Sequence, residues 1–369
     1  MAMPRRFHFD LKLLAAASAL VVIGVIMVFD TSSALAADKL ADPFHFAFNQ
    51  SGGAVLGILA MLAMAAAGQP VYEQKWFVFG LLGLSFGLLA LCLATPEVAS
   101  THRWLVLAGF RFQPSELAKI AVILFLARTA ADAEERINEP KAFLPAIAAL
   151  GGVVLLILLE PDFGTAVLTF GVGGLLLLIG GVRWKKLLGL GLAAAPVFVT
   201  FVLLSPYKII RVLEFFTKNK DLQKASYQVD QSKLAVASGG LLGASFGEGT
   251  QKYFLPAPHT DFIFSVIAEE LGLLGSLVVL GLFLVLVWRG LAIALKAPTF
   301  ASQLVAAGLT FLLALQALLN ISVVLGLTPA KGVPLPLISF GRSSLLCSLL
   351  AVGILLHISK RRPAARGNV

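Results

Sequence analysis

Carboxylates lie in a stretch of this sequence that is otherwise suited to the interior of a membrane. The segment LPAPHTDFIFSVIAEELG, residues 255–272, carries Asp261 after two prolines and a histidine, and then Glu269 and Glu270 within an apolar run. Inside a bilayer a carboxylate costs about 2.5 kcal/mol or more, so it is expected to face a partner or a watery cavity. These three residues are therefore the first to consider for chemistry.

Helix geometry separates the three carboxylates. If residues 261–270 form one helix, Glu269 lies about 80° from Asp261 around the axis, whereas Glu270 lies nearly opposite. Glu269 is thus expected to share a polar wall with Asp261, and Glu270 to face another helix. A second interpretation is that Asp261 caps a helix beginning at Phe262, since aspartate is favoured at the N-terminal cap. Capping and catalysis do not exclude each other.

Other polar residues gather in connections that hydropathy places on the same side of the membrane. In SELAK, residues 115–119, Glu116 and Lys119 are three apart, so they share a helical face and can pair. The EPD turn at 160–162 is very short. The residues of interest in these connections are Arg103 in HRW, Glu116 and Lys119 in SELAK, Glu160 and Asp162 in EPDFGTA, and Lys331, Ser339, Arg342, Ser343 and Ser344 in TPAKGVPLPLISFGRSSLL.

The longest polar connection runs from about residue 206 to 261. Its first part, YKIIRVLEFFTKNK, predicts an amphipathic helix at the membrane interface. Glycines punctuate residues 227–256, whose apolar runs are too short to span. Because non-helical backbone near a membrane must be satisfied by protein or water, this part predicts a re-entrant or cavity-lining element. Its candidate polar groups are Gln228, Gln231, Ser232, Lys233, Gln251 and Lys252, with His259 and Thr260 beside Asp261.

Arginines and lysines around a few carboxylates suit a lipid that carries phosphate, because charge-assisted hydrogen bonds hold phosphate strongly. Partial burial would raise the pKa of Asp261 from about 3.9 toward the range of a base that deprotonates a hydroxyl. If pyrophosphate leaves, cations can take the developing charge and no general acid is needed. The residues alone leave open a lipid-linked glycosyltransferase and a transporter of lipids or anions.

The elements that must position these residues are membrane-spanning helices. Of 369 residues, 58% are hydrophobic and 13% are charged, and apolar runs of roughly 18 to 25 residues are long enough to cross a bilayer. We predict an all-α polytopic membrane protein that forms a single domain over residues 1–369. Its expected spans, about ten, cover residues 12–30, 46–67, 76–95, 115–131, 142–159, 163–182, 187–205, 262–288, 300–326 and 341–358.

The positive charges predict the orientation of these spans. Lys and Arg occur at alternate ends, which places both termini in the cytoplasm and the connection at 206–261, between helices 7 and 8, outside. The net charge of +9 reflects this topology and anionic lipid rather than nucleic acid. The start, MAMPRRFHFDLK with a later SSALAA, resembles a signal peptide. Its apolar run of about 17 residues is long for one, so we expect a retained helix.

Several functional classes lack support in the sequence. The two cysteines, Cys92 and Cys347, both lie in apolar spans, so neither a disulfide framework nor a thiolate metal site is expected. Metalloprotease, phosphate-loop and dinucleotide motifs are missing, which argues against ATP-driven transport. No firm cofactor follows, although a divalent cation, Mg²⁺ or Mn²⁺, accompanying a pyrophosphate stays open.

Long motifs resemble the SEDS family of shape, elongation, division and sporulation proteins. They are YQVDQSKLAVASGGLLG, GTQKYFLPAPHTDFIFSVIAEELGLLG and LLGLTPAKGVPLPLISFGRSSLL, with HRWLVLAGFRFQPSELAKI and EPDFGTA as two further segments. The resemblance runs in order over essentially the whole chain. The QK pair before LPAPHTDF and the closing LPLISFGRSSLL look more like the FtsW branch than the RodA branch.

This resemblance implies a ten-span peptidoglycan glycosyltransferase that polymerises lipid II outside the bacterial cytoplasmic membrane, in septal synthesis during division. It further implies a class B penicillin-binding transpeptidase and other divisome membrane proteins as partners. Asp261 would be the base that activates the acceptor hydroxyl, with inversion at the donor sugar. The family's charged positions map to Arg103, Glu116, Lys119, Asp162 and Lys252, and Gln231, Lys233, His259, Thr260, Glu269 and Ser343 are further expected substrate contacts.

The sequence departs from the family pattern in two places. A glycine usual after the aromatic of the last motif is Arg342 here, which adds bulk and charge where a close backbone approach is expected. The segment CLATPEVAST also lacks glycines common there. Asp261 and its neighbours match the family, so the enzymatic interpretation is kept. A RodA-like elongation polymerase, a lipid II flippase, and a scaffold that recruits the transpeptidase are the alternatives.

Overall fold

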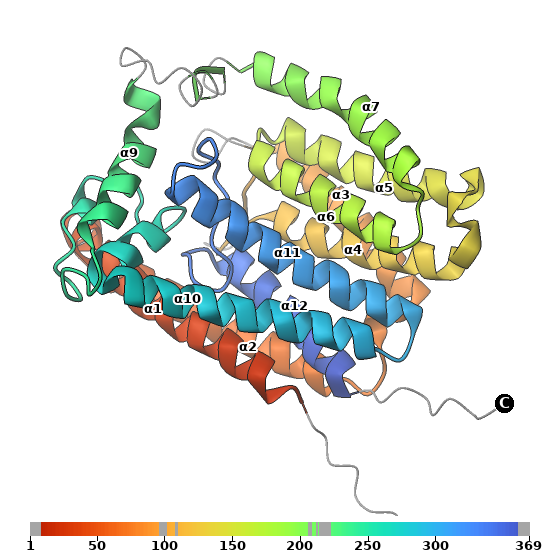
Figure 1. Ribbon diagram of the computed structural model, residues 1–369, viewed down its shortest axis with the longest axis horizontal. Coiled ribbons are helices and arrows are strands. Elements are labelled where there is room, and N and C mark those ends of the chain that lie inside the picture. Colours follow the sequence, from red (N-terminus) through yellow and green to blue (C-terminus); the bar gives the residue numbers. More distant parts are fainter. Residues whose placement is uncertain are drawn as a thin grey trace, which may run out of the picture.

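The computed structural model describes residues 9–95, 102–107, 110–205, 209–211, 213 and 223–360. Most of its helices run along the long axis of the molecule (Figure 1), and the described residues form one two-stranded hairpin. The helices and strands are α1 (Leu11–Leu40), α2 (His45–Ala66), α3 (Lys75–Ala94), β1 (Leu105–Leu107), β2 (Phe110–Phe112), α4 (Pro114–Ala133), α5 (Pro140–Leu159), α6 (Phe163–Ile179), α7 (Trp184–Leu203), α9 (Gln223–Ser238), α10 (Ile263–Lys296), α11 (Phe300–Val324) and α12 (Arg342–Lys360); short 3-10 turns are η1 (Val71–Glu73), η2 (Glu134–Asn138) and η4 (Gln251–Tyr253).

Each predicted span falls on one of these helices, and the all-helical membrane fold is confirmed. Within the described residues, eight helices are long and apolar enough to cross a membrane, namely α1, α2, α3, α5, α7, α10, α11 and α12. Helix α6 has only 17 residues, and α4 carries Glu116, Lys119 and Arg128. That these two also cross the membrane stays a prediction.

The first and last described helices meet at one end of the bundle. The backbone N–H of Asp10 donates to Ser359 Oγ at 3.3 Å, and Arg289 Nε, from the end of α10, donates to Asp10 Oδ2 at 2.9 Å. The start of α1 and the ends of α10 and α12 therefore share a face, as the charge pattern requires. The assignment of that face to the cytoplasm stays a prediction.

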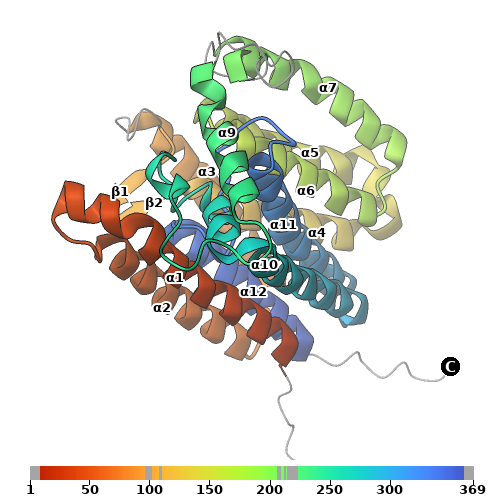
Figure 2. The same cartoon turned by 60° about the vertical axis from the view of Figure 1, so that its left-hand side comes forward.

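Helices α4, α11 and α12 form the buried centre, whereas α7 packs at the edge and has no buried residue (Figure 2). The unusual Arg342 begins α12, where its stem lies against α2. A Cβ added at Gly53 would lie only 3.1 Å from Arg342 Cγ. A missing side chain on α2 thus makes room for the larger residue.

The long connection packs back onto α10. Much of the predicted interfacial helix lies outside the described residues, and the connection then forms α9 and a glycine-rich segment. Helix α10 is kinked at Gly272, whose φ of 65° favours glycine. The backbone N–H groups of Ala244 and Leu273 donate to Glu269 O and Gly240 O, both at 3.0 Å. Protein thus satisfies this non-helical backbone, as expected near a membrane.

Candidate functional site

Asp261 lies in the turn before α10 rather than on the helix. The helical projection that grouped it with Glu269 was therefore wrong. The N-terminal cap of α10 is Phe262, and no side chain hydrogen bonds to the first turn. The hypothesis that Asp261 caps this helix is thus also wrong. Among the described residues, its backbone carbonyl accepts a hydrogen bond from Asn320 Nδ2 at 2.8 Å, and its carboxylate accepts none.

The carboxylate of Asp261 lies among cations. Burial raises its pKa to about 6, Arg103 and Arg211 oppose this rise, and Asp162 adds to it. A methyl group placed on Gly332 would lie 3.4 Å from Asp261 Oδ2 and 3.5 Å from Arg103 Nη1. The carboxylate and the guanidinium therefore flank the same point beside the last connection. We call Asp261, Arg103, Arg211, Asp162 and Gly332 the Asp261 site.

Amides from α11 fix the backbone around the Asp261 site. Asn320 Nδ2 also donates to Val333 O at 2.9 Å, so one side chain ties the Asp261 turn to the last connection. Gln316 Nε2 donates to Pro334 O at 3.0 Å and its Oε1 accepts from Lys119 Nζ at 2.9 Å. The predicted pair of Lys119 with Glu116 is present, with 2.9 Å between Nζ and Oε1. This pair is buried and links α4 to α11.

Both carboxylate oxygens of Asp162 accept hydrogen bonds from nearby residues. It is the N-terminal cap of α6, where Oδ1 accepts from the Thr165 N–H at 3.0 Å. Its Oδ2 accepts from Thr165 Oγ1 at 2.9 Å and from Gln113 Nε2 at 3.1 Å. The predicted role of Asp162 in binding substrate stays a prediction, and its observed role is to shape the α5–α6 turn and its charge.

Two cations beside this region were not among the predicted contacts. Arg211 Nη1 donates to Ala330 O at 3.2 Å, which holds part of the long connection against the last one. Lys331 is partly buried, its Nζ is 6.0 Å from the centre of the Phe163 ring, and burial lowers its pKa. The sequence signal for Lys331 was its place among prolines, whereas Arg211 lies in the segment that predicts an amphipathic interfacial helix, where a cation needs no special role.

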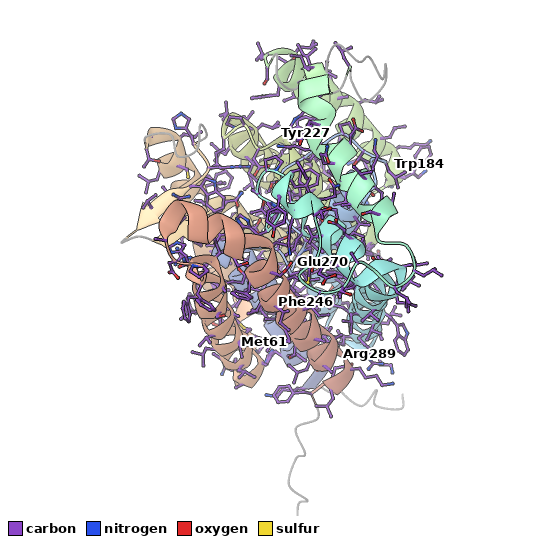
Figure 3. All side chains as sticks on the ribbon, turned by 90° about the vertical axis from the view of Figure 1, so that its left-hand side faces the viewer. Met61, Trp184, Tyr227, Phe246, Glu270 and Arg289 are labelled. Carbon is purple, nitrogen blue, oxygen red and sulfur yellow. The ribbon has the colours of Figure 1, made fainter. Side chains whose placement is uncertain are left out.

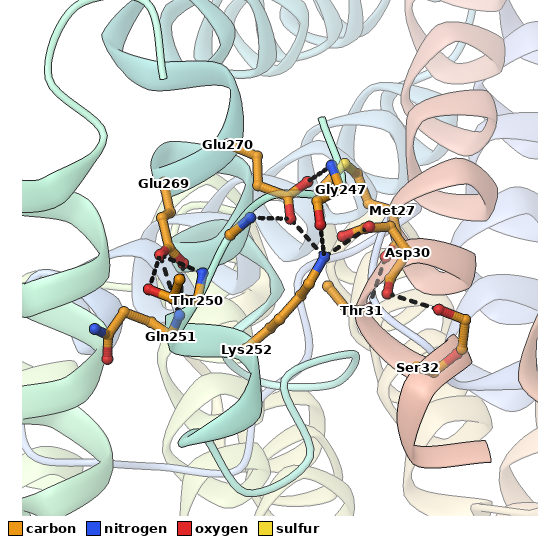
Figure 4. A network of polar contacts seen from close by, with 12 residues as sticks. Met27, Asp30, Thr31, Ser32, Gly247, Thr250, Gln251, Lys252, Glu269 and Glu270 are labelled. Atoms are coloured by element: carbon orange, nitrogen blue, oxygen red, sulfur yellow. Dashed lines mark hydrogen bonds and ion pairs between the residues drawn. The ribbon is translucent and has the colours of Figure 1, made fainter. Parts of the chain in front are cut away.

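A second cluster lies where α1, α10 and the glycine-rich segment meet, and Figure 3 shows Glu270 there. Lys252 Nζ lies 2.8 Å from both Asp30 Oδ1 and Glu270 Oε1, and these three side chains are buried. Burial alone would lower the pKa of Lys252, but its hydrogen bonds to the two carboxylates raise it. We call Asp30, Lys252 and Glu270 the Lys252 cluster (Figure 4).

The two glutamates of α10 fold back onto this segment. Glu270 accepts hydrogen bonds from the backbone N–H groups of Gly247 and Gly249 at 3.0 and 3.1 Å. Glu269 Oε1 accepts from the N–H groups of Thr250 and Gln251 at 2.8 and 3.1 Å (Figure 4). The expectation that Glu269 shares a polar wall with Asp261 was therefore wrong. The carboxylates of Glu269 and Glu270 instead bind the backbone of the segment that leads to Asp261.

The remaining predicted contacts have local partners, and their binding roles stay predictions. His259 is buried between rings, 4.7 Å from Phe46 and 5.4 Å from Phe340 between centroids, and burial lowers its pKa to about 4. Thr260 Oγ1 donates to Ala257 O, Ser343 Oγ donates to Arg111 O, Lys233 pairs with Asp230 on the surface, and Gln231 is half-buried on α9.

The family model of FtsW, RodA and SpoVE, described as cell cycle proteins, matches residues 11–363. The chain belongs to this family. A probable peptidoglycan glycosyltransferase FtsW of Geobacter sp. (strain M18) is 37% identical over 363 residues, covering 97% of this chain and 98% of that protein. The stage V sporulation protein E of Bacillus subtilis (strain 168) is 37% identical over 359 residues, covering 95% and 97%.

Solved structures agree with the family assignment. A chain from a peptidoglycan synthase complex that coordinates polymerization and crosslinking matches with a TM-score of 0.77 and 31% identity, covering 95% of this chain and 97% of that one. The rod shape determining protein RodA of Thermus thermophilus matches with a TM-score of 0.71 and 27% identity, covering 97% and 99%. The likeness extends over nearly the full length of each chain, so this is a multi-pass membrane protein with the family fold.

Proposed function

We propose that this protein is a peptidoglycan glycosyltransferase that polymerises lipid II into glycan strands at the outer face of the bacterial cytoplasmic membrane. The observation that carries the proposal is the Asp261 carboxylate. It caps no helix, accepts no hydrogen bond from the described residues, and is acted on by the positive charges of Arg103 and Arg211. A carboxylate kept in this way is available to a substrate, and the name peptidoglycan glycosyltransferase among the relatives indicates the class of reaction.

In the proposed reaction, Asp261 accepts the proton of the GlcNAc 4-hydroxyl of the acceptor. The hydroxyl oxygen forms a bond to the MurNAc anomeric carbon of the donor, and the bond from that carbon to the pyrophosphate oxygen breaks with inversion. The electron pair leaves on undecaprenyl pyrophosphate, and in this proposal Arg103, Arg211 and Lys331 stabilise its charge. The pKa of about 6 keeps Asp261 ionised near neutral pH, as a base requires.

Partners and a metal requirement belong to the same proposal. A class B penicillin-binding transpeptidase and other division proteins at the septum are expected partners, supported by the FtsW names and by the synthase-complex structure. No group of three or more His, Cys, Asp or Glu side chains that could hold a metal ion was found in the described residues. A divalent cation, Mg²⁺ or Mn²⁺, that accompanies the pyrophosphate of the substrate stays open.

The test is polymerisation of purified lipid II by the protein with its cognate transpeptidase, comparing the wild type with Asp261→Asn. We expect glycan from the wild type and none from the variant. Because burial disfavours the ionised form of Asp261, the variant is expected to be at least as stable at pH 7 and to bind the partner. Equal glycan from both proteins excludes Asp261 as the base. Lipid translocation without glycan favours a flippase, and partner binding alone favours a scaffold.

A further inference from the structure

A carboxyl group beside the Asp261 site is used by nothing described so far. Glu160 is the residue that ends α5, and its exposed fraction is 0%. Neither of its two carboxyl oxygens has a hydrogen-bond partner in the part of the chain that the structure describes. The other buried glutamates, Glu116, Glu269 and Glu270, each accept from a lysine or from backbone N–H groups. A fully buried carboxylate without any partner would be very costly, so the exception calls for an explanation.

The surroundings of Glu160 favour its neutral form. Asp162 of the same turn repels a second negative charge, and the C-terminal end of α5 adds the negative end of its dipole. The Arg103 guanidinium, from the segment before β1, acts on Glu160 through its charge, and Glu160 in turn acts on the Cys92 thiol of α3. Burial raises the pKa of Glu160 to about 8, Asp162 adds to this rise, and Arg103 opposes it. At neutral pH Glu160 is therefore mainly protonated.

Arg103 connects this carboxyl group to the chemistry. Its charge acts on both Asp261 and Glu160, and its Nε is buried without a hydrogen-bond partner among the described residues. A guanidinium beside an ionised carboxylate forms a short, charge-assisted and often bidentate pair. Beside a neutral carboxyl group it keeps its charge free for another anion. The protonation state of Glu160 thus decides whether Arg103 is free to bind an anion in the Asp261 site or forms an ion pair with Glu160.

We propose that Glu160 is a positioning residue that works in its protonated form: neutral, it leaves Arg103 free to meet the substrate's diphosphate, and ionised, it withdraws Arg103 into an ion pair. This inference rests on the proposed glycosyltransferase function, since it concerns the same reaction. It adds a second carboxyl group whose task is to stay uncharged, and it predicts that alkaline pH inactivates the enzyme through this group.

The test measures the initial rate of glycan formation from lipid II, by the full chain with its transpeptidase, between pH 7 and pH 9. With a titration near pH 8, the wild-type rate should fall about tenfold over this range. Glu160→Gln and Glu160→Met cannot ionise, so the ratio of their own rates at the two pH values should be near one. The control is Glu135→Gln, at an exposed glutamate of η2, which should follow the wild-type profile.

Two results would overturn the proposal. A wild-type rate that does not fall between pH 7 and pH 9 means that Glu160 does not titrate against activity. A fall that persists in both Glu160 variants assigns the alkaline loss to another group, with Lys331 the first to examine, because burial lowers its pKa. A flat profile in either variant beside a falling wild type supports the proposal, so loss of folding in one variant leaves the other decisive.

Thermal unfolding separates this inference from the proposed function. An acid whose folded pKa is raised stabilises the fold fully below its unfolded pKa and loses that contribution as pH rises toward the folded value. From about pH 4.5 to pH 8 the wild-type melting temperature should therefore fall relative to that of Glu160→Gln. Parallel curves would contradict a neutral Glu160. If no glycan forms at any pH, the proposed function fails, and these curves still decide the charge state of Glu160.

Discussion

The Lys252 cluster and the Asp261 site are both built from buried or half-buried charges near the start of α10, but they differ in how their hydrogen bonds are satisfied. In the Lys252 cluster one ammonium lies 2.8 Å from each of two carboxylates, and the backbone N–H groups of Gly247 and Gly249 donate to Glu270, so that Asp30 Oδ2 alone has no partner among the described residues. In the Asp261 site the Asp261 carboxylate and Arg103 Nε have no partner among the described residues.

This difference separates charged groups that stabilise the fold from charged groups that are available to bind a substrate. A buried polar group that already has its hydrogen bonds contributes to the fold, and moving it toward a substrate would cost those bonds. A group held without partners is costly to keep but ready to bind. The family position of Lys252 suggested a substrate contact. In the structure its side chain instead joins α1, α10 and the connection between α9 and α10.

The largest effect on stability is expected at Lys252. Lys252→Met leaves Asp30 and Glu270 buried beside each other, and breaking a buried ion pair in this way costs about 3–5 kcal/mol. Thermal unfolding in detergent should show the loss. Lys233→Met is the matched control, since its pair with Asp230 is exposed and should cost less than about 1 kcal/mol.

The same experiment can break the comparison. If Lys252→Met unfolds like the wild type but fails to form glycan, Lys252 belongs to the chemistry and the division between the two clusters is wrong. Partial recovery of stability in a triple variant, Asp30→Asn, Lys252→Met and Glu270→Gln, would confirm that the cost comes from unpaired charge.

The sequence predicted the parts of this arrangement that depend on local pattern. Apolar runs gave the helices, and the spacing of Glu116 and Lys119 gave their ion pair, because residues three apart share a helical face. The partners of Glu269 and Glu270 could not be predicted. They depend on a glycine-rich segment folding back onto α10, and on Asp30, which is 222 residues from Lys252 in sequence.

The sequence indicated only in part which residues hold the backbone around the Asp261 site. Asn320 and Gln316 are polar residues within an apolar span, which signals a buried partner, but no local rule names the backbone that each one binds. The role of Asp261 in chemistry stays a prediction, and its placement on the helix was wrong. Its position depends on where α10 begins, and helix ends are the least certain part of a sequence pattern.

The next largest effect is expected in the acid range and sharpens the role of Asp261. A base must be ionised, and the pKa of Asp261 is raised to about 6 by burial. The rate of glycan formation should therefore fall about hundredfold between pH 7 and pH 4. Co-purification of the partner at each pH checks that the fold is kept. A rate that stays level down to pH 4 would exclude Asp261 as the group that accepts the proton.

The smallest effect is expected at Gly332, which tests whether the space between Asp261 and Arg103 is where the substrate reacts. In Gly332→Ala the new methyl group would lie in ordinary contact with both side chains, at 3.4 Å and 3.5 Å, so the fold can accept it. A methyl group in a substrate site costs about tenfold in rate, and Gly332→Val should cost more. Gly52→Ala on α2, where a Cβ would meet no atom within 4 Å, is the control. If Gly332→Val polymerises as fast as Gly52→Ala, the acceptor hydroxyl does not approach Asp261 from this side, and Arg103 must meet the diphosphate elsewhere.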